Sequence, residues 1–385
     1  MSYKLLKKGL EVELYAGTKD GDVLPLSTKL KEQFPDFSQE PDQRNFEYIT
    51  KPTSDYNELF KEIIQPRIEV RDFLKTQGEL TLIPGSTMPL PFKKDFYYSK
   101  PGDDYHEFIL NTYRTSVITT SLHINIGIDN YENLFKLLCA LRLDTPLFLA
   151  LSASSPFHDG KLTGFNSYRW HSFPKTPKDV PFFTNHHEYA TWINEQLKTK
   201  KMFNVRHQWT SIRSNGPNRP QELNRIEIRI CDLVSDTKKV LSIVALIECL
   251  IQKYLTEDNY PKILNKKQTE LNGLVKVIEE QEELVAKDGL NAKIWNWRND
   301  SNDTASKIID LLHKDLESIS KKLSISKNLT SILDILNEGN EATQFLNLHK
   351  KNKSIRETVK HFIEQFTIMD FKSHDMIKSA IKLSS

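Results

Sequence analysis

Polar and apolar residues alternate along several short segments of this chain, as they do in strands with one buried face. Residues 9–14 read Gly-Leu-Glu-Val-Glu-Leu, so a strand there places Glu11 and Glu13 on one face and the apolar side chains on the other. Three further segments share the design, with Asn45 and Glu47 in 45–49, His123 and Asn125 in 123–127, and Glu227 and Arg229 in 225–232. Together they predict a sheet that carries hard metal ligands above a packed core, a surface that suits divalent cations and phosphate chemistry.

Helices are predicted between these strands. Apolar residues recur at helical spacing in 131–142 and 236–254, and 55–74 indicates a third helix that Pro66 divides or ends halfway. Because the strands are half polar, one sheet face is solvated, which is typical of antiparallel pairing. The fold class expected is therefore α+β with a mainly antiparallel sheet, whose strand candidates are 9–15, 44–50, 79–84, 117–128 and 225–232.

The composition changes near residue 256, where lysine and glutamate become dominant and strand patterns become sparse. Apolar residues recur every three or four positions in 308–323 and 355–366, and a Ser354-x-x-Glu357 capping box opens the second run. Gly339 stands where a helix ending near Asn337 would stop. We therefore expect two regions, a domain in 1–255 and an all-helical C-terminal extension in 256–385. The extension could be a cap on the sheet, an oligomerisation element or a separate bundle.

Length and composition restrict the class of protein. The chain has 385 residues, 38% of them hydrophobic, which is enough for a large core. Its net charge of +2 gives no general attraction for nucleic acid or membrane. The sequence has no apolar run long enough to span a bilayer, and its first residues lack the apolar core of a signal peptide. Three scattered cysteines in apolar contexts are expected to be buried thiols, so we expect a soluble cytoplasmic protein.

Carboxylates are the ligands that Mg²⁺ prefers, and the candidates are Glu11, Glu13, Glu47 and Glu227. A single Glu-x-Glu strand is usually an ordinary solvated face, but several such strands with apolar backing favour a metal site. A lone histidine is more often a hydrogen-bonded core residue. With Asn125 on the same face, His123 becomes a candidate metal ligand or phosphate contact.

Arginines supply the second part of the predicted chemistry. Arg229 lies two residues from Glu227, where its guanidinium would neutralise a transferring phosphoryl group unless it only forms a salt bridge with a glutamate. Arg169 and Arg213, with Arg206 and Arg219, lie among aromatic and turn residues, where an arginine can clamp a substrate carboxylate. The chain has no P-loop, dinucleotide fingerprint, zincin motif or Cys-x-x-Cys, so any nucleotide must bind through metal ions on the sheet.

Several stretches together resemble the cyanobacterial-type glutamate–cysteine ligases, within the wider carboxylate–amine ligase superfamily. They span about residues 1–255 and read GLEVELYAG (9–17), EPDQRNFEYITKP (40–52), LTLIPGST (80–87), SLHINIGI (121–128), LFLALSASSPFHDGKLTGFNSYRW (147–170), NVRHQW (204–209) and LNRIEIRICD (223–232). The two longest stretches are the most specific.

The resemblance implies a catalytic domain similar to those of glutamine synthetase and guanido kinases, with a curved antiparallel sheet forming a funnel and helices outside. It implies ATP- and Mg²⁺-dependent joining of the γ-carboxylate of L-glutamate to the amino group of L-cysteine, the first step of glutathione synthesis. The family's metal-binding positions map onto Glu11, Glu13, Glu47 and Glu227, with His123 nearby. The phosphate-contacting arginine maps onto Arg229. Arg229 and Glu47 are then the expected catalytic residues, and Asn125 and His123 are expected to help bind the nucleotide.

Three alternatives stay open at this point. The enzyme could be a ligase of the same superfamily with a different amine acceptor. It could be a guanido-kinase-like phosphotransferase, which would form a stable phosphorylated product without a second substrate. It could also be a non-catalytic protein whose lysine-rich helical region binds a partner. The carboxylates of one sheet face argue against the last, because an inert sheet gains nothing from their mutual repulsion.

Overall fold

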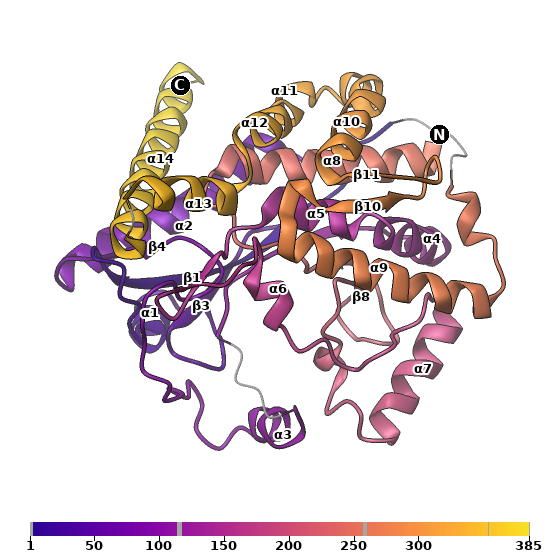
Figure 1. The fold of residues 1–385 in the computed structure, drawn as a ribbon, viewed down its shortest axis with the longest axis horizontal. Helices are drawn as coiled ribbons and strands as arrows, with labels where there is room; N and C mark the ends of the chain where they lie inside the picture. Colours follow the sequence, from indigo (N-terminus) through magenta and orange to yellow (C-terminus); the bar gives the residue numbers. More distant parts are fainter. Residues whose placement is uncertain (1–2, 114–117, 257–259, 353, 385) are drawn as a thin grey trace.

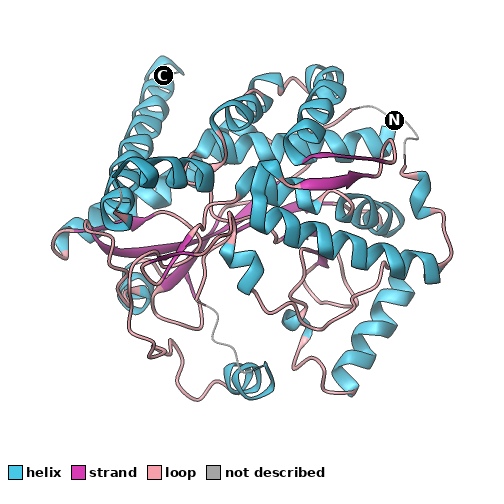
Figure 2. Cartoon of the chain, in the orientation of Figure 1, coloured by secondary structure: helices cyan, strands magenta, loops and turns pink. Residues whose placement is uncertain are grey.

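A single antiparallel sheet forms the centre of the molecule (Figure 2). The computed structural model describes residues 3–113, 118–256, 260–352 and 354–384. The strand order is β2-β3-β1-β5-β9-β8, and β4 pairs with the second half of β1. The strands are β1 (Lys8–Thr18), β2 (Ser38–Gln39), β3 (Asn45–Ile49), β4 (Leu80–Ile83), β5 (Leu122–Gly127), β8 (Ile212–Asn215) and β9 (Arg225–Ile228). The expected curved, mainly antiparallel sheet flanked by helices is confirmed.

Two predicted strands are at least four residues shorter in the structure. The prediction for 117–128 begins at residue 117, which lies outside the described residues, and β5 covers Leu122–Gly127. The prediction for 225–232 runs past the end of β9 at Ile228, because the chain bulges there and then turns to place Asp232 in a buried polar cluster. A separate small hairpin consists of β6 (Phe157–His158) and β7 (Lys161–Leu162).

Helices cover the apolar face of the sheet (Figure 1). Side chains of β1, β5 and β9 share one buried cluster with the apolar residues of α4 and α8, the two helices predicted at 131–142 and 236–254. The helices of this half of the chain are α1 (Ser27–Gln33), α2 (Tyr56–Thr76), α3 (Asp104–Tyr113), α4 (Tyr131–Arg142), α5 (Thr145–Ser152), α6 (Tyr168–Ser172), α7 (His186–Lys198) and α8 (Thr237–Thr256), with a 3₁₀ turn η1 (Val205–His207).

The prediction that Pro66 divides the helix at 55–74 is wrong, because α2 runs unbroken through it. Proline removes one backbone hydrogen bond and crowds the preceding turn, which costs about 3 kcal/mol in a helix interior. Tertiary contacts offset that cost: Ile63, Ile64 and Ile68 flank the proline and are fully or almost fully buried. Asp55 also caps the helix by accepting from the N–H groups of Asn57 and Glu58.

The C-terminal region is helical as expected, with one addition that the sequence pattern does not predict, a hairpin of β10 (Lys293–Asn296) and β11 (Ser301–Thr304). Its helices are α9 (Gln268–Asp288), α10 (Ala305–Lys322), α11 (Ser326–Leu329), α12 (Ser331–Glu338), α13 (Glu341–Asn352) and α14 (Ile355–Ser384), with 3₁₀ turns η2 (Lys262–Leu264) and η3 (Gly289–Asn291). Gly339 terminates α12 with a positive φ of 89°, as predicted. Ser354 accepts from the Glu357 N–H, which is one of the two hydrogen bonds of the predicted capping box.

One apolar core runs through both regions. Leu271 and Ile278 of α9 and Ile308 of α10 belong to the same buried cluster as Leu10 of β1 and Ile243 of α8. In Figure 1, α9 and α10 lie beside α5 and α8, and the contacts between these elements agree. The three cysteines are buried free thiols, as expected. None of the helices in the described ranges is both long and apolar enough to cross a membrane.

A buried charge cluster ties α14 to α2. Asp370 of α14 is 1% exposed and accepts a hydrogen bond from Arg71 Nε at 2.8 Å, with Arg67 Nη1 3.5 Å away. Both guanidiniums lie over the ring of Phe366. One carboxylate therefore balances two buried arginines, so the contact between these helices depends on it.

We expect Asp370→Asn to lower the free energy of unfolding by about 3–5 kcal/mol, because it leaves two buried guanidiniums without a counter-charge. Urea unfolding at neutral pH measures the effect. Asp375→Asn is the matched control, since Asp375 is an exposed carboxylate of the same helix. Equal stability of the two variants would contradict this view of the cluster.

Candidate active site

Strand register brings the predicted polar residues onto one face of the sheet. On paired strands, Glu13 lies opposite Glu47, Glu11 lies opposite His123, and Asn125 lies opposite Glu227. On its other side, Glu227 lies opposite Arg213. The alternating residues point to the other face and are buried, as the period of two requires. Lys8 is an exception on that apolar face, where its ammonium forms a fully buried ion pair with Glu248 of α8 at 2.7 Å.

His123 lies at the centre of the polar face. Its Nδ1 is 2.9 Å from Glu11 Oε2, and its Nε2 is 2.9 Å from Ser121 Oγ. Asn125 Nδ2 donates to the other oxygen of Glu11 at 3.1 Å. Both side chains are at least nine-tenths buried. These contacts fix the orientation of Glu11 from two sides.

Two groups of ligand atoms could each hold a metal ion. One consists of Glu11, His123 and Glu227, and the other of Glu13, Glu47 and His123, with the ligand atoms of each group within 4.8 Å of one another. Their oxygen-rich composition fits Mg²⁺, which takes carboxylate ligands and keeps waters for phosphate oxygens. The structure thus brings together every residue that the sequence predicts as a metal ligand.

The electrostatics of the second group also fit a cation. Burial and the neighbouring Glu40 raise the pKa of Glu13 to about 7. Burial, together with Glu40 and the other glutamates of this face, raises the pKa of Glu47 well above its usual value. Like charges in a desolvated place disfavour ionisation, and a divalent cation would relieve both effects.

Glu227 has different surroundings. It is fully buried, and its two oxygens accept from Arg213 Nε and Nη2, Asn215 Nδ2 and Arg229 Nη1. Although burial acts in the opposite direction, the guanidiniums of Arg213 and Arg229 hold the pKa of Glu227 well below its usual range. Glu227 is therefore ionised and saturated with donors, so metal coordination by it requires Arg229 to move.

A bulge at the end of β9 aims Arg229 into the site. The N–H groups of Arg229 and Ile230 both donate to the carbonyl of Ser211, at 2.8 and 3.1 Å, so two residues oppose one. The Nε of Arg229 is buried and has no hydrogen-bond partner among the described residues. Arg229 thus keeps a donor for a bound anion while Nη1 holds Glu227.

The two predicted substrate-clamping arginines have different positions. Arg169 lines the pocket above the polar face, although its Nε pairs with Asp232 at 2.8 Å and its Nη2 donates to the carbonyls of residues 229–231. Arg213 is not among the residues that line this pocket, and it contacts Glu227 and the carbonyls of Arg206 and Gln208. Arg169 therefore positions the segment that carries Arg229, and Arg213 positions Glu227.

The pocket of about 100 Å³ also contains residues that the sequence analysis missed, among them Glu40 and Trp209. Burial raises the pKa of Glu40. The nearby guanidinium of Arg229 acts to lower this pKa, and the nearby carboxylate of Glu11 acts to raise it. Glu40 follows the two-residue strand β2, so no alternating pattern marks it. Its only signal is its place at the start of the 40–52 stretch quoted above.

Comparison with known proteins gives consistent matches. The model of the family described as glutamate-cysteine ligase family 2 matches residues 7–364, which includes most of the C-terminal helical region. A relative from Solibacter usitatus named "Putative glutamate--cysteine ligase 2" is 26% identical over 314 residues, covering 79% of this chain and 78% of its own. One of the same name from Chloroflexus aggregans is 23% identical over 368 residues, covering 92% and 89%.

Two solved structures have the same fold. A glutamate–cysteine ligase from Francisella tularensis, in complex with AMP, superposes with a TM-score of 0.70 at 14% identity, covering all of this chain and 94% of its own. A bifunctional glutathione synthetase from Pasteurella multocida gives a TM-score of 0.74 at 15% identity, and the match covers 95% of this chain but only 53% of that one. The fold that the resemblance implies is confirmed.

The raised pKa of Glu13 predicts a pH effect on the metal-free protein. A carboxyl with a folded-state pKa near 7 and a usual value of 4.5 stabilises the fold fully below pH 4.5, and this stabilisation is lost as the pH rises through 7. Relative to Glu13→Gln, the wild type should therefore lose about 3 kcal/mol of unfolding free energy across this range. Urea unfolding in EDTA at several pH values measures it.

Glu58→Gln is the control for this experiment, because Glu58 is an exposed glutamate of α2 whose removal should leave the pH dependence of the wild type intact. If the difference in unfolding free energy between the wild type and Glu13→Gln does not change with pH, Glu13 is not buried as a neutral acid.

Proposed function

Because the chain belongs to glutamate–cysteine ligase family 2 and is a carbon–nitrogen ligase, we propose that it joins the γ-carboxylate of L-glutamate to the amino group of L-cysteine at the expense of ATP. The product would be γ-glutamylcysteine, from which glutathione is built. The observation that carries this proposal is the face of glutamates beside Arg229 Nε, a buried donor that has no hydrogen-bond partner in the described part of the chain. We place the reaction in the cytoplasm, where ATP and reduced cysteine occur.

The carboxylate face fits magnesium bound with the nucleotide. Mg²⁺ would be held by Glu11, Glu13, Glu47, Glu227 and His123, and when bound it supplies positive charge that offsets the charge of the phosphates and of the substrate carboxylate. Asn125 and His123 lie on the same face and are our candidates for contacts with the nucleotide phosphates. Glu47 lies opposite Glu13 in the register and is, with Arg229, our candidate catalytic residue.

The chemistry requires activation of a poor electrophile. The γ-carboxylate attacks the terminal phosphorus of ATP, ADP leaves, and an acyl phosphate forms. The unprotonated amine of cysteine then attacks the acyl carbon, inorganic phosphate leaves with the bonding electrons, and the nitrogen releases one proton to give the amide. The guanidinium of Arg229 stabilises the charge on the transferred phosphoryl group, and its unpaired Nε is the donor available for this. Metal binding by Glu227 would require Arg229 Nη1 to leave Glu227 Oε1, which would keep its hydrogen bond from Arg213 Nη2.

Arg169 is the candidate contact for the substrate carboxylate, because it lines the pocket with Glu13 and Arg229. Arg213 acts on substrate indirectly in this scheme, through Glu227. The residues do not identify the amine by themselves, so a ligase of the same family with another acceptor is the second candidate.

The first test is ADP release with ATP, Mg²⁺ and glutamate, comparing no acceptor, cysteine and a panel of other amines. We expect release that depends on cysteine, with γ-glutamylcysteine detected by mass spectrometry. Release with another amine would keep the mechanism and replace the acceptor. ADP release without any acceptor, with a stable phosphorylated product, would indicate a phosphotransferase. No ADP release with glutamate and any of the amines would refute the proposal.

Arg229→Lys should lower kcat by about 10²–10³, because a point charge does not replace the planar donor set at the transferring phosphoryl group. The KM for ATP should change much less. Arg356→Lys is the control, since Arg356 is a half-exposed arginine that pairs with Asp22, and neither residue lines the pocket. A kcat of Arg229→Lys within twofold of the wild type would remove Arg229 from the catalytic residues.

A further inference from the structure

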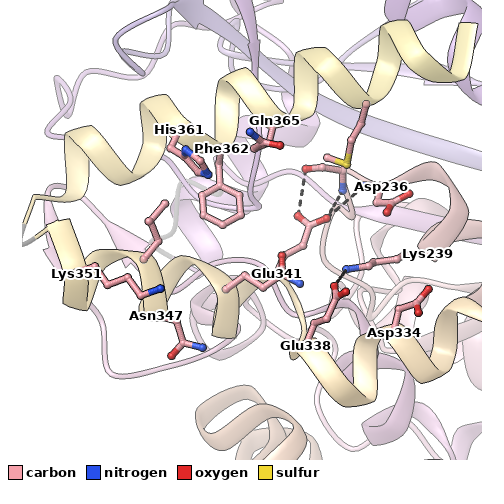
Figure 3. Close-up of a pocket in the computed structure, with 14 residues that line it drawn as sticks. Asp236, Lys239, Asp334, Glu338, Glu341, Asn347, Lys351, His361, Phe362 and Gln365 are labelled. Carbon is pink, nitrogen blue, oxygen red and sulfur yellow. Dashed lines mark hydrogen bonds and ion pairs between the residues drawn. The ribbon is translucent and has the colours of Figure 1, made fainter. Parts of the chain in front are cut away.

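A second pocket, of about 540 Å³, lies outside the polar face of the sheet. Its walls come from α12, α13 and α14 and from the chain that enters α8 (Figure 3). This volume is within the range of small-molecule sites. None of its lining residues belongs to the candidate active site, so it requires a separate explanation.

Charges of opposite sign lie at opposite ends of this pocket. Figure 3 shows Asp334 and Glu338 at one end, with Asp236 above them, and Lys351 at the other end. Lys239 partly neutralises the acidic end through Glu338, at 3.4 Å. Within the described residues, Asp334 and Lys351 each have no ion-pair partner. An acidic end and a basic end are thus both available to a ligand.

The middle of the pocket is apolar. Phe362 projects into it between the two charged ends (Figure 3), and Leu348 and Met369 also line it. The ring of Phe362 stacks on Phe345 of α13 with centroids 3.9 Å apart, which restricts its rotation. The pocket therefore offers a fixed apolar surface to the hydrocarbon part of a ligand.

The frame of the pocket is held by buried hydrogen bonds. The carboxylate of Glu341, 7% exposed, accepts from the Ser235 N–H at 2.6 Å and from Ser235 Oγ at 3.1 Å. The Ser235 carbonyl accepts from Arg67 of α2 at 2.8 Å. Such contacts fix the start of α13 against the start of α8, which holds this wall of the pocket in place.

We propose that this pocket binds a short zwitterionic peptide, with its ammonium group at the acidic end beside Asp334 and its carboxylate at Lys351, on the two sides of the apolar middle. His361 lies beside the basic end and adds a second nitrogen there. The proposal does not depend on the identity of the ligase substrates. It gives the C-terminal helices a binding role besides their part in the core.

A matched set of three peptides tests both charged ends by isothermal titration calorimetry on the full chain. The probes are glycyl-L-leucine, its N-acetyl form, which lacks the ammonium, and its C-terminal amide, which lacks the carboxylate. We expect glycyl-L-leucine to bind and each blocked form to bind about fivefold more weakly or worse, since each loses one charge pair. Equal binding of the three peptides, or no binding of any, would overturn the proposal.

Variants separate this pocket from the active site. Asp334→Asn and Lys351→Met should each weaken glycyl-L-leucine binding about fivefold, whereas Lys350→Met should leave it unchanged. Lys350 is the neighbouring exposed lysine of α13 and does not line the pocket. Glu227→Gln should also bind the peptide normally. Binding that is lost in Glu227→Gln and kept in Lys351→Met would place the peptide in the active site and refute the assignment.

Discussion

Repulsion among carboxylates that share one buried sheet face is the constraint on which the site depends. Glu13 and Glu47 lie directly opposite each other, and Glu11 lies two residues from Glu13 on the same face. Such a group is unfavourable in an apolar setting unless cations or hydrogen-bond donors compensate it. His123, Asn125, Arg213 and Arg229 supply this compensation at one end of the face, and the other end keeps raised pKa values that a metal ion would lower.

Among the described residues, Arg169 forms no hydrogen bond with the glutamates of this face, and it extends this arrangement from outside them. Arg169 binds Asp232 and three consecutive carbonyls, which fixes the segment after the bulge, and this segment carries Arg229. Asp232 is held in turn by the hydroxyls of Ser155 and Ser167. The reactive groups therefore stand on strands and a pinned bulge, which gives the geometric precision that catalysis at a phosphoryl group requires.

The sequence predicts the features of this site that depend on local periodicity. A period of two places Glu11, Glu13, Glu47 and Glu227 on one face wherever the strands pair, so their common face could be foreseen. Features that depend on distant contacts could not. Glu40 sits on a loop without a pattern, α2 continues through Pro66 because of tertiary burial, and Arg213 turns to Glu227 because the register of β8 and β9 places the two opposite each other.

The same distinction explains the C-terminal helices. Their amphipathic periods predict helices but not what those helices cover, and the core shows that they cover the domain itself. The connection continues to the catalytic face. Arg67, beside Asp370 of α14, donates from Nε to the hydroxyl of Tyr48, and Tyr48 precedes Ile49 and follows Glu47 in β3. Neighbouring residues of a strand point to opposite faces, so Tyr48 lies on the apolar face and Glu47 on the polar face. A contact that fixes Tyr48 therefore also fixes the backbone that carries Glu47. We therefore infer that α14 helps to hold the carboxylate face in place, through Asp370, Arg67 and Tyr48.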